Sequence, residues 1–232
     1  MTEKNSEETS VLPVPEFPTS KSVELEMEEE MIVLYQSIDS LRSGTQNQVI
    51  QFMCPSEQEG TSTIVREFAT TAVLKYSKSV LILDADMRKP AQHPFFNITL
   101  EHSLEETIRE GDPVDKALYQ IANSSLFLSQ LFQGSDSTRQ FLDSAVIDDL
   151  LEKLRQRFDF ILIDSPPATG FSIGLATSDA VSGVVLVLEA EKTSWQAAKN
   201  LTDRIINNGG KIFGVVFNKQ RHHIPQFLYK RL

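Results

Sequence analysis

The sequence has a single cysteine, Cys54, and no long apolar run, and these two shortages narrow the classes of protein it can be. One cysteine excludes an internal disulfide framework and fits a reducing compartment. No stretch of about 18 apolar residues is present, so we expect no membrane-spanning helix. The N-terminus lacks the basic start and apolar core of a secretory signal. Together these features predict a cytoplasmic protein.

Positive charge is also scarce, because 22 lysines and arginines face 32 aspartates and glutamates, a net charge of −10. Residues 1–30 carry nine acidic and two basic side chains, which is −7 of that total and leaves −3 for the remainder. A nucleic-acid surface needs clustered lysine and arginine, so we expect no nucleic-acid partner. Residues 221–232 are locally basic, and we interpret them as a solvated tail. The alternative is contact with an acidic partner or an anionic membrane surface.

The chain divides by composition into three parts. Residues 1–26 are rich in Glu, Ser, Thr and Pro and poor in large apolar side chains, which predicts a disordered acidic tail. Residues 27–220 form one domain, since a chain of 232 residues with 41% hydrophobic content can bury a sizeable core. Residues 221–232 are the short basic tail.

Apolar runs alternate with helical patterns through the central part. Near-continuous apolar strands separated by helices are typical of a doubly wound, mostly parallel α/β sheet with helices on both faces. Ligands of such sheets bind at the carboxyl ends of the strands. Helices are predicted at 27–41, 63–75, 104–109, 114–117, 136–157 and 194–207. Strands are predicted at 49–53, 79–84, 126–128, 158–164, 184–188 and 212–217.

Residues 54–63, Cys-Pro-Ser-Glu-Gln-Glu-Gly-Thr-Ser-Thr, stand where a phosphate-binding loop belongs, between an apolar run and a helical pattern. The P-loop pattern is G-x-x-x-x-G-K-[ST], whose backbone N–H groups cradle phosphates while its lysine reaches the β- and γ-phosphates. Gly60, Ser62 and Thr63 fit the end of this pattern. Thr61 stands in the place of the lysine. The loop is therefore an incomplete phosphate site.

Two further segments end predicted strands in carboxylates. One begins at Asp84 and contains Asp86, and the other begins at Asp164. Carboxylates at strand ends beside a phosphate loop orient Mg²⁺ or its waters. A lone aspartate that ends a strand is more often a cap or a turn residue. Two such strands after a P-loop-like turn favour the metal site.

Together these motifs resemble the bacterial tyrosine autokinases of capsule and exopolysaccharide synthesis, a branch of the MinD/ParA-like P-loop ATPases. That family's loop runs about S-x-x-P-G-E-G-K-S-T. Its second motif, D-A-D-x-R-x-P-x-x-H, matches residues 84–93, and its third, (Y/F)-D-(Y/F)-x-x-x-D-(S/T)-P-P, matches residues 158–167. Residues 179–187 and 214–219 are also similar to the family. The resemblance covers roughly residues 28–220.

The resemblance implies ATP and Mg²⁺ as cofactors of an active site, and it assigns roles to individual residues. Those that would contact the nucleotide are Gly60, Thr61, Ser62, Thr63 and Asn218, the last near the adenine. Those that would hold the metal or its waters are Ser62, Asp84 and Asp164. Asp86 would be the base for an incoming hydroxyl. For Asn218, a turn role at the end of a strand is an equal alternative.

The chain departs from the family pattern at the phosphate loop. Loss of the lysine at Thr61 would alone cost about tenfold to a hundredfold in affinity and would slow phosphoryl transfer further. Gln58 replaces a glycine, which costs on the order of 1–2 kcal/mol if that position needs a positive φ. Ile173 stands where many members carry an aspartate.

The chain also lacks most of the family's residues for subunit assembly and autophosphorylation. The family ends in a cluster of tyrosines, whereas residues 221–232 contain only Tyr229. The family's E-x-x-R-x-x-R helix, which helps to build a ring of subunits, is matched best by residues 36–42. Only Arg42 of that motif is retained, and Gln36 and Asp39 replace the other two residues.

These losses favour a degenerate, pseudokinase-like regulator of exopolysaccharide or capsule biosynthesis. Its partner would be a membrane-anchored polysaccharide co-polymerase or a kinase of the same pathway, reached in the cytoplasm or at the inner membrane. Assembly into a homo-oligomer is left open. The first alternative is an active ATP- and Mg-dependent tyrosine autokinase, because the carboxylates of the site are retained. The second is a MinD/ParA-like positioning ATPase, which the acidic body and the missing lysine disfavour.

Overall fold

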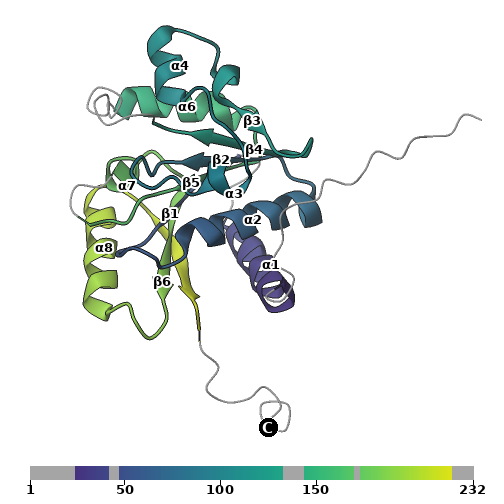
Figure 1. Ribbon diagram of the computed structural model, residues 1–232. Coiled ribbons are helices and arrows are strands. Elements are labelled where there is room, and N and C mark those ends of the chain that lie inside the picture. Colours follow the sequence, from purple (N-terminus) through teal and green to yellow (C-terminus); the bar gives the residue numbers. More distant parts are fainter. Residues whose placement is uncertain (1–23, 42–46, 133–143, 170–172, 221–232) are drawn as a thin grey trace, which may run out of the picture.

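The centre of the molecule is a seven-stranded sheet in the order β3-β4-β2-β5-β1-β6-β7, with helices on both faces (Figure 1). This is a computed structural model that describes residues 24–41, 47–132, 144–169 and 173–220. All strand pairs are parallel except β3 with β4, which form an antiparallel pair at one edge. The predicted doubly wound, mostly parallel α/β fold is confirmed.

The elements have the following bounds. The strands are β1 (Gln48–Met53), β2 (Val80–Asp84), β3 (Tyr119–Gln120), β4 (Leu126–Gln130), β5 (Phe160–Asp164), β6 (Gly183–Glu189) and β7 (Ile212–Asn218). The helices are α1 (Glu24–Ser40), α2 (Thr61–Tyr76), α3 (Gln92–Phe95), α4 (Leu104–Glu110), the 3-10 helix η1 (Val114–Ala117), α6 (Ser144–Arg155), α7 (Ile173–Ala176) and α8 (Trp195–Asn207). Within the described ranges, none of these helices is both long and apolar enough to cross a membrane.

The pleat of the central strands divides the core into two layers. In β1, Val49 and Met53 face one layer while Ile50 and Phe52 face the other, as expected for successive side chains of a strand. The first layer is covered by α4, α6, α7 and α8, and the second by α1 and α2. Because both faces are covered, the strands are apolar on both sides, which explains their near-continuous hydrophobic runs.

An aromatic cluster attaches α1 to the second layer. The Tyr35 ring stacks on Tyr76 with centroids 3.7 Å apart, and it meets Phe160 edge-on at 5.7 Å. Phe68 of α2 meets the same Phe160 ring edge-on at 5.9 Å. The helix begins at Glu24, three residues before the predicted start and inside the predicted tail 1–26.

Three short elements have no counterpart among the predicted ones, namely β3, α3 and α7. Each has four residues or fewer, so no periodic pattern could reveal it, and α3 contains a proline. Several predicted features lie outside the described residues: the tails at 1–23 and 221–232 with Tyr229, the first part of the helix at 136–157, and Arg42.

The order of the strands brings three loops together at one edge of the sheet. The chain passes from β1 through α2 to β2, which lies beyond β5, whereas β6 and β7 lie on the other side of β1. This reversal around β1 is the point at which doubly wound sheets bind ligands. The carboxyl ends of β1, β2 and β5 therefore meet beside the loop at 54–60.

Close packing between β6 and β7 gives a test of the fold. A Cβ added at Gly183 would lie 2.2 Å from the Phe213 ring, whereas one added at Gly214 would meet nothing within 4 Å. We expect Gly183→Ala to lower the free energy of unfolding by about 1–3 kcal/mol in urea denaturation. Gly214→Ala, the matched control, should be neutral or slightly stabilising because it removes a flexible residue from a strand.

Replacement of Phe213 by leucine should recover part of that loss, because the two residues share one space. Strictly additive effects of the two substitutions would contradict the packing argument. So would a Gly183→Ala protein as stable as the parent.

Candidate functional site

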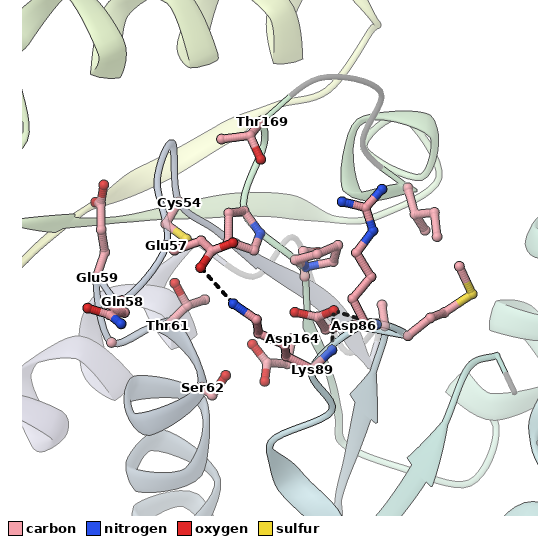
Figure 2. A pocket seen from close by; sticks show the side chains of 18 of the residues that line it. Cys54, Glu57, Gln58, Glu59, Thr61, Ser62, Asp86, Lys89, Asp164 and Thr169 are labelled. Carbon is pink, nitrogen blue, oxygen red and sulfur yellow. Dashed lines mark hydrogen bonds and ion pairs between the residues drawn. The ribbon is translucent and has the colours of Figure 1, made fainter. Parts of the chain in front are cut away.

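The loops that follow β1, β2 and β5 enclose a cavity of about 520 Å³ (Figure 2). Six of the eight predicted site residues line it: Gly60, Thr61, Ser62, Thr63, Asp86 and Asp164. The other two, Asp84 and Asn218, are not part of its wall. The three sequence motifs therefore converge on one cavity, at the edge of the sheet where the fold predicts a ligand.

The loop after β1 leads directly into the N-terminus of α2. Gly60 precedes α2 with φ 91°, and no side chain caps the first turn of the helix. Uncapped amides at the start of a helix attract anions, and the helix dipole adds to this attraction. Gln58 has φ 65°, so its position does need the left-handed conformation that a glycine would adopt more easily.

Thr61 occupies the position of the missing lysine and faces the cavity (Figure 2). The residue is only 5% exposed, and its hydroxyl has no nitrogen or oxygen partner among the described residues. Burial raises the pKa of the neighbouring Cys54 thiol to about 11, and a hydrogen bond with Thr61 opposes this shift in part. A neutral hydroxyl and a neutral thiol thus stand where the P-loop pattern has a positive charge.

Residues at the carboxyl ends of β6 and β7 hold the phosphate loop through hydrogen bonds. Asn218 Nδ2 donates to the carbonyl oxygen of Glu59 at 2.8 Å, and a Cβ on Gly60 would lie 2.0 Å from that nitrogen. Glu59 Oε2 in turn accepts the backbone N–H of Glu189 at 3.2 Å. Lys219 Nζ donates to the carbonyl oxygen of Gln58. The amide nitrogen of Asn218 therefore supports the loop, and its contact with adenine stays a prediction.

Asp84 is buried behind the cavity, where it folds the loop that follows β2. Its Oδ1 accepts the backbone N–H of Asp86 at 3.0 Å. Its Oδ2 accepts the backbone N–H groups of Ala91 at 2.9 Å and Gln92 at 3.0 Å. Burial raises the pKa of Asp84, and these hydrogen bonds oppose the shift. Both carboxylate oxygens are thus used by the backbone.

Asp86 repeats this arrangement one turn further along. Its Oδ1 accepts the backbone N–H groups of Arg88 at 2.9 Å and Lys89 at 3.0 Å. Unlike Asp84, it lies in the cavity wall. Its predicted role as a base is compatible with this position and stays a prediction.

Gln92 is the residue of the site that sequence reasoning missed. Its side chain is fully buried, and Nε2 donates to Asp164 Oδ2 at 2.6 Å and to the carbonyl oxygen of Ser62 at 3.2 Å. Arg66 donates to Gln92 Oε1 at 3.4 Å, which turns the amide nitrogen toward Asp164. The sequence carries no signal for this contact, because Gln92 falls on an unspecified position of the second motif.

These contacts bear on whether the predicted metal ligands fit magnesium, which prefers a near-octahedral set of oxygens. Both oxygens of Asp84 accept backbone N–H groups, and Asp164 accepts hydrogen bonds from Gln92 and Ser62. In the part of the chain that the structure describes, no three His, Cys, Asp or Glu side chains are grouped to hold a metal ion. Because magnesium is commonly held through one or two carboxylates together with substrate phosphates, the role of Ser62, Asp84 and Asp164 as metal ligands stays a prediction.

Asp164 has the most perturbed carboxyl group of the site. Burial raises the pKa of Asp164 to about 7, and the nearby Asp84 carboxylate acts in the same direction. An aspartate in the unfolded chain titrates near pH 3.9, at about its reference value. The folded state therefore binds this proton more tightly. The associated stability is complete below about pH 4 and is lost as the pH rises toward 7.

We expect Asp164→Asn to stabilise the protein increasingly from pH 4 to pH 8, by up to about 4 kcal/mol. Asparagine has no proton to lose, and its carbonyl oxygen can still accept from Gln92. Urea denaturation at several pH values in EDTA measures the difference. Asp179→Asn, at an exposed aspartate, is the control and should show no such trend. A difference that shrinks as the pH rises would contradict the assignment.

Comparisons with known proteins agree with this architecture. The family profile described as AAA domain matches residues 58–210, which is more than half of the chain. CapB of Staphylococcus aureus, named as a candidate tyrosine-protein kinase, is 26% identical over 179 residues, covering 76% of this chain and 78% of CapB. Tyrosine-protein kinase ptk of Acinetobacter johnsonii is 24% identical over 176 residues, covering 76% of this chain and 24% of ptk. The chain thus spans about a quarter of the length of ptk.

Solved structures show the same fold. The chimerical protein CapA2B2 has a TM-score of 0.77 at 22% identity, covering 86% of this chain and 88% of its own. The kinase domain of Escherichia coli tyrosine kinase ETK has a TM-score of 0.76 at 20% identity, covering 85% and 78%. An McdA variant of Cyanothece in complex with ATP has a TM-score of 0.61 at 25% identity, covering 75% and 71%. The predicted relationship to bacterial tyrosine kinases is confirmed.

Proposed function

This chain belongs to the AAA domain family, and we propose that it is a tyrosine-kinase-like protein of exopolysaccharide or capsule biosynthesis that acts by contact instead of phosphoryl transfer. The observation that carries the proposal is Thr61. A short neutral side chain, buried in the cavity wall, stands where the phosphate loop needs a lysine. Relatives named as tyrosine-protein kinases support the kinase-like part of the proposal, and the resemblance of the three motifs to the autokinases of capsule and exopolysaccharide synthesis suggests the process.

A kinase site must neutralise the phosphates and the charge that develops in the transition state. Thr61 contributes no charge to this, and the hydrogen bonds of Gln92 and Ser62 already occupy Asp164 on the opposite wall. The side of the site that meets the phosphates therefore lacks its charge. This pattern supports a protein whose fold is used for binding to a partner.

The partner we propose is a membrane-anchored polysaccharide co-polymerase or an active kinase of the same pathway. The protein would meet it in the cytoplasm or at the inner membrane. The fold is held together by two buried core layers, so its surfaces keep their shape even if the cavity catalyses no reaction. Contact with a partner can therefore persist without turnover. Self-association is compatible with the same proposal.

Turnover is tested directly with ATP and magnesium. We expect the parent protein to release no phosphate and to incorporate none on tyrosine above background. Thr61→Lys should raise ATP affinity by roughly tenfold to a hundredfold in calorimetry, because it restores a charged hydrogen bond to phosphate. Thr202→Lys on α8 adds the same charge outside the cavity wall and should leave affinity unchanged. If the parent protein turned over ATP at the rate of an active relative, the proposal would be wrong and the autokinase alternative would be favoured.

The contact role is tested in cells that lack the chromosomal copy. Asp86→Asn removes the predicted base while its carbonyl oxygen can still accept the loop N–H groups. We expect this variant to restore polysaccharide output to the level of the parent protein. Loss of output by a variant with unchanged thermal unfolding would show that chemistry at Asp86 is needed. Specific sedimentation with liposomes or DNA at physiological salt would instead favour a positioning ATPase.

A further inference from the structure

An ion pair crosses the mouth of the cavity from one loop to the other. Lys89 Nζ, from the loop after β2, lies 2.8 Å from Glu57 Oε2 in the loop after β1 (Figure 2). Both residues belong to the cavity wall. Their side chains are 71% and 60% exposed, so the pair is not a buried structural contact. An ion pair this exposed contributes little to stability and is easily exchanged.

Among the described residues of the wall, Lys89 and Arg88 are the two cations, and they lie beside four carboxyl groups. The base of its side chain is fixed, because its backbone N–H donates to Asp86 Oδ1 at 3.0 Å. The four-carbon stem lets the ammonium group move independently of that anchor. Lys89 can therefore release Glu57 and meet another anion within the same cavity.

The floor of the cavity is built for such an anion. The sixteen-residue helix α2 begins there without a side-chain cap, and its dipole favours negative charge. The Thr61 hydroxyl, almost fully buried and without a nitrogen or oxygen partner among the described residues, faces the same space. Among the described residues that line the cavity, the loop after β2 supplies the positive charges, and Lys89 is the one that already reaches across to the loop after β1.

We propose that Lys89 is the cation that holds the phosphate groups of a nucleotide in this cavity, and that Glu57 occupies it when no nucleotide is bound. The inference rests on the proposed function in one respect, since the nucleotide would be held and not consumed. Glu57 then acts as a competing anion within the protein. Binding replaces a weak exposed ion pair with a contact to several phosphate oxygens.

The experiment is calorimetric titration of ATP in EDTA, with pyrophosphate as a second probe. We expect Lys89→Gln to weaken ATP binding by roughly tenfold or more, the loss typical of one charged hydrogen bond. Glu57→Gln should tighten binding several-fold, because it frees Lys89 and removes a like charge. The matched control is the exposed ion pair of Lys116 and Asp112, at 2.6 Å and outside the wall. Lys116→Gln and Asp112→Asn should leave affinity unchanged.

The double variant decides whether the two residues are coupled. In the Lys89→Gln background, Glu57→Gln should give little of the gain that it gives alone. An equal gain in both backgrounds, parent-like affinity of Lys89→Gln, or no binding to the parent at millimolar ATP would each overturn the proposal. Pyrophosphate binding as strong as ATP binding would overturn the nucleotide as ligand. None of these results depends on turnover, so each is distinguishable from failure of the proposed function.

Discussion

The carboxylate of Asp84 is the contact on which the geometry of the site depends. It is 1% exposed and accepts three backbone N–H groups from the loop that follows β2. These bonds hold the loop in the shape that delivers the Gln92 amide to Asp164 and the Lys89 ammonium to Glu57. A charged acceptor with several N–H donors is held more strongly than a neutral one. Asp84 thus shapes the cavity without lining it.

The phosphate loop has its own supports, and they do not involve a ligand. Asn218 and Lys219 at the end of β7 donate to its carbonyl oxygens, and Glu59 is tied to β6. Strained backbone persists only where its surroundings over-determine it, and Gln58 with its positive φ is such a case. The loop therefore keeps its form although the lysine is absent. The contacts that shape the loop thus come from β6, β7 and Lys219, and not from the side chain at position 61.

The sequence predicted the fold well, because the central strands are apolar on both faces. Each of them therefore stands out in the sequence as a separate run of apolar residues. It placed six of eight site residues at the cavity, since strand ends of a parallel sheet share one edge. It failed where a contact depends on how a loop folds back. Gln92 reaches Asp164 across 72 residues of sequence through a turn that only Asp84 explains. The Lys89–Glu57 pair, which joins two loops 32 residues apart in the sequence, is of the same kind.

Charge links these observations. A cavity with four carboxyl groups needs a counter-charge, which a P-loop lysine and magnesium normally provide. Contacts within this chain also relieve the excess of negative charge. Burial beside Asp84 raises the pKa of Asp164 to about 7, which removes its charge over much of the acidic range. The Gln92 amide satisfies the oxygen of Asp164, and Lys89 neutralises Glu57. Because each of these carboxyl groups is met from within the chain, the fold can hold them close together without a lysine at position 61.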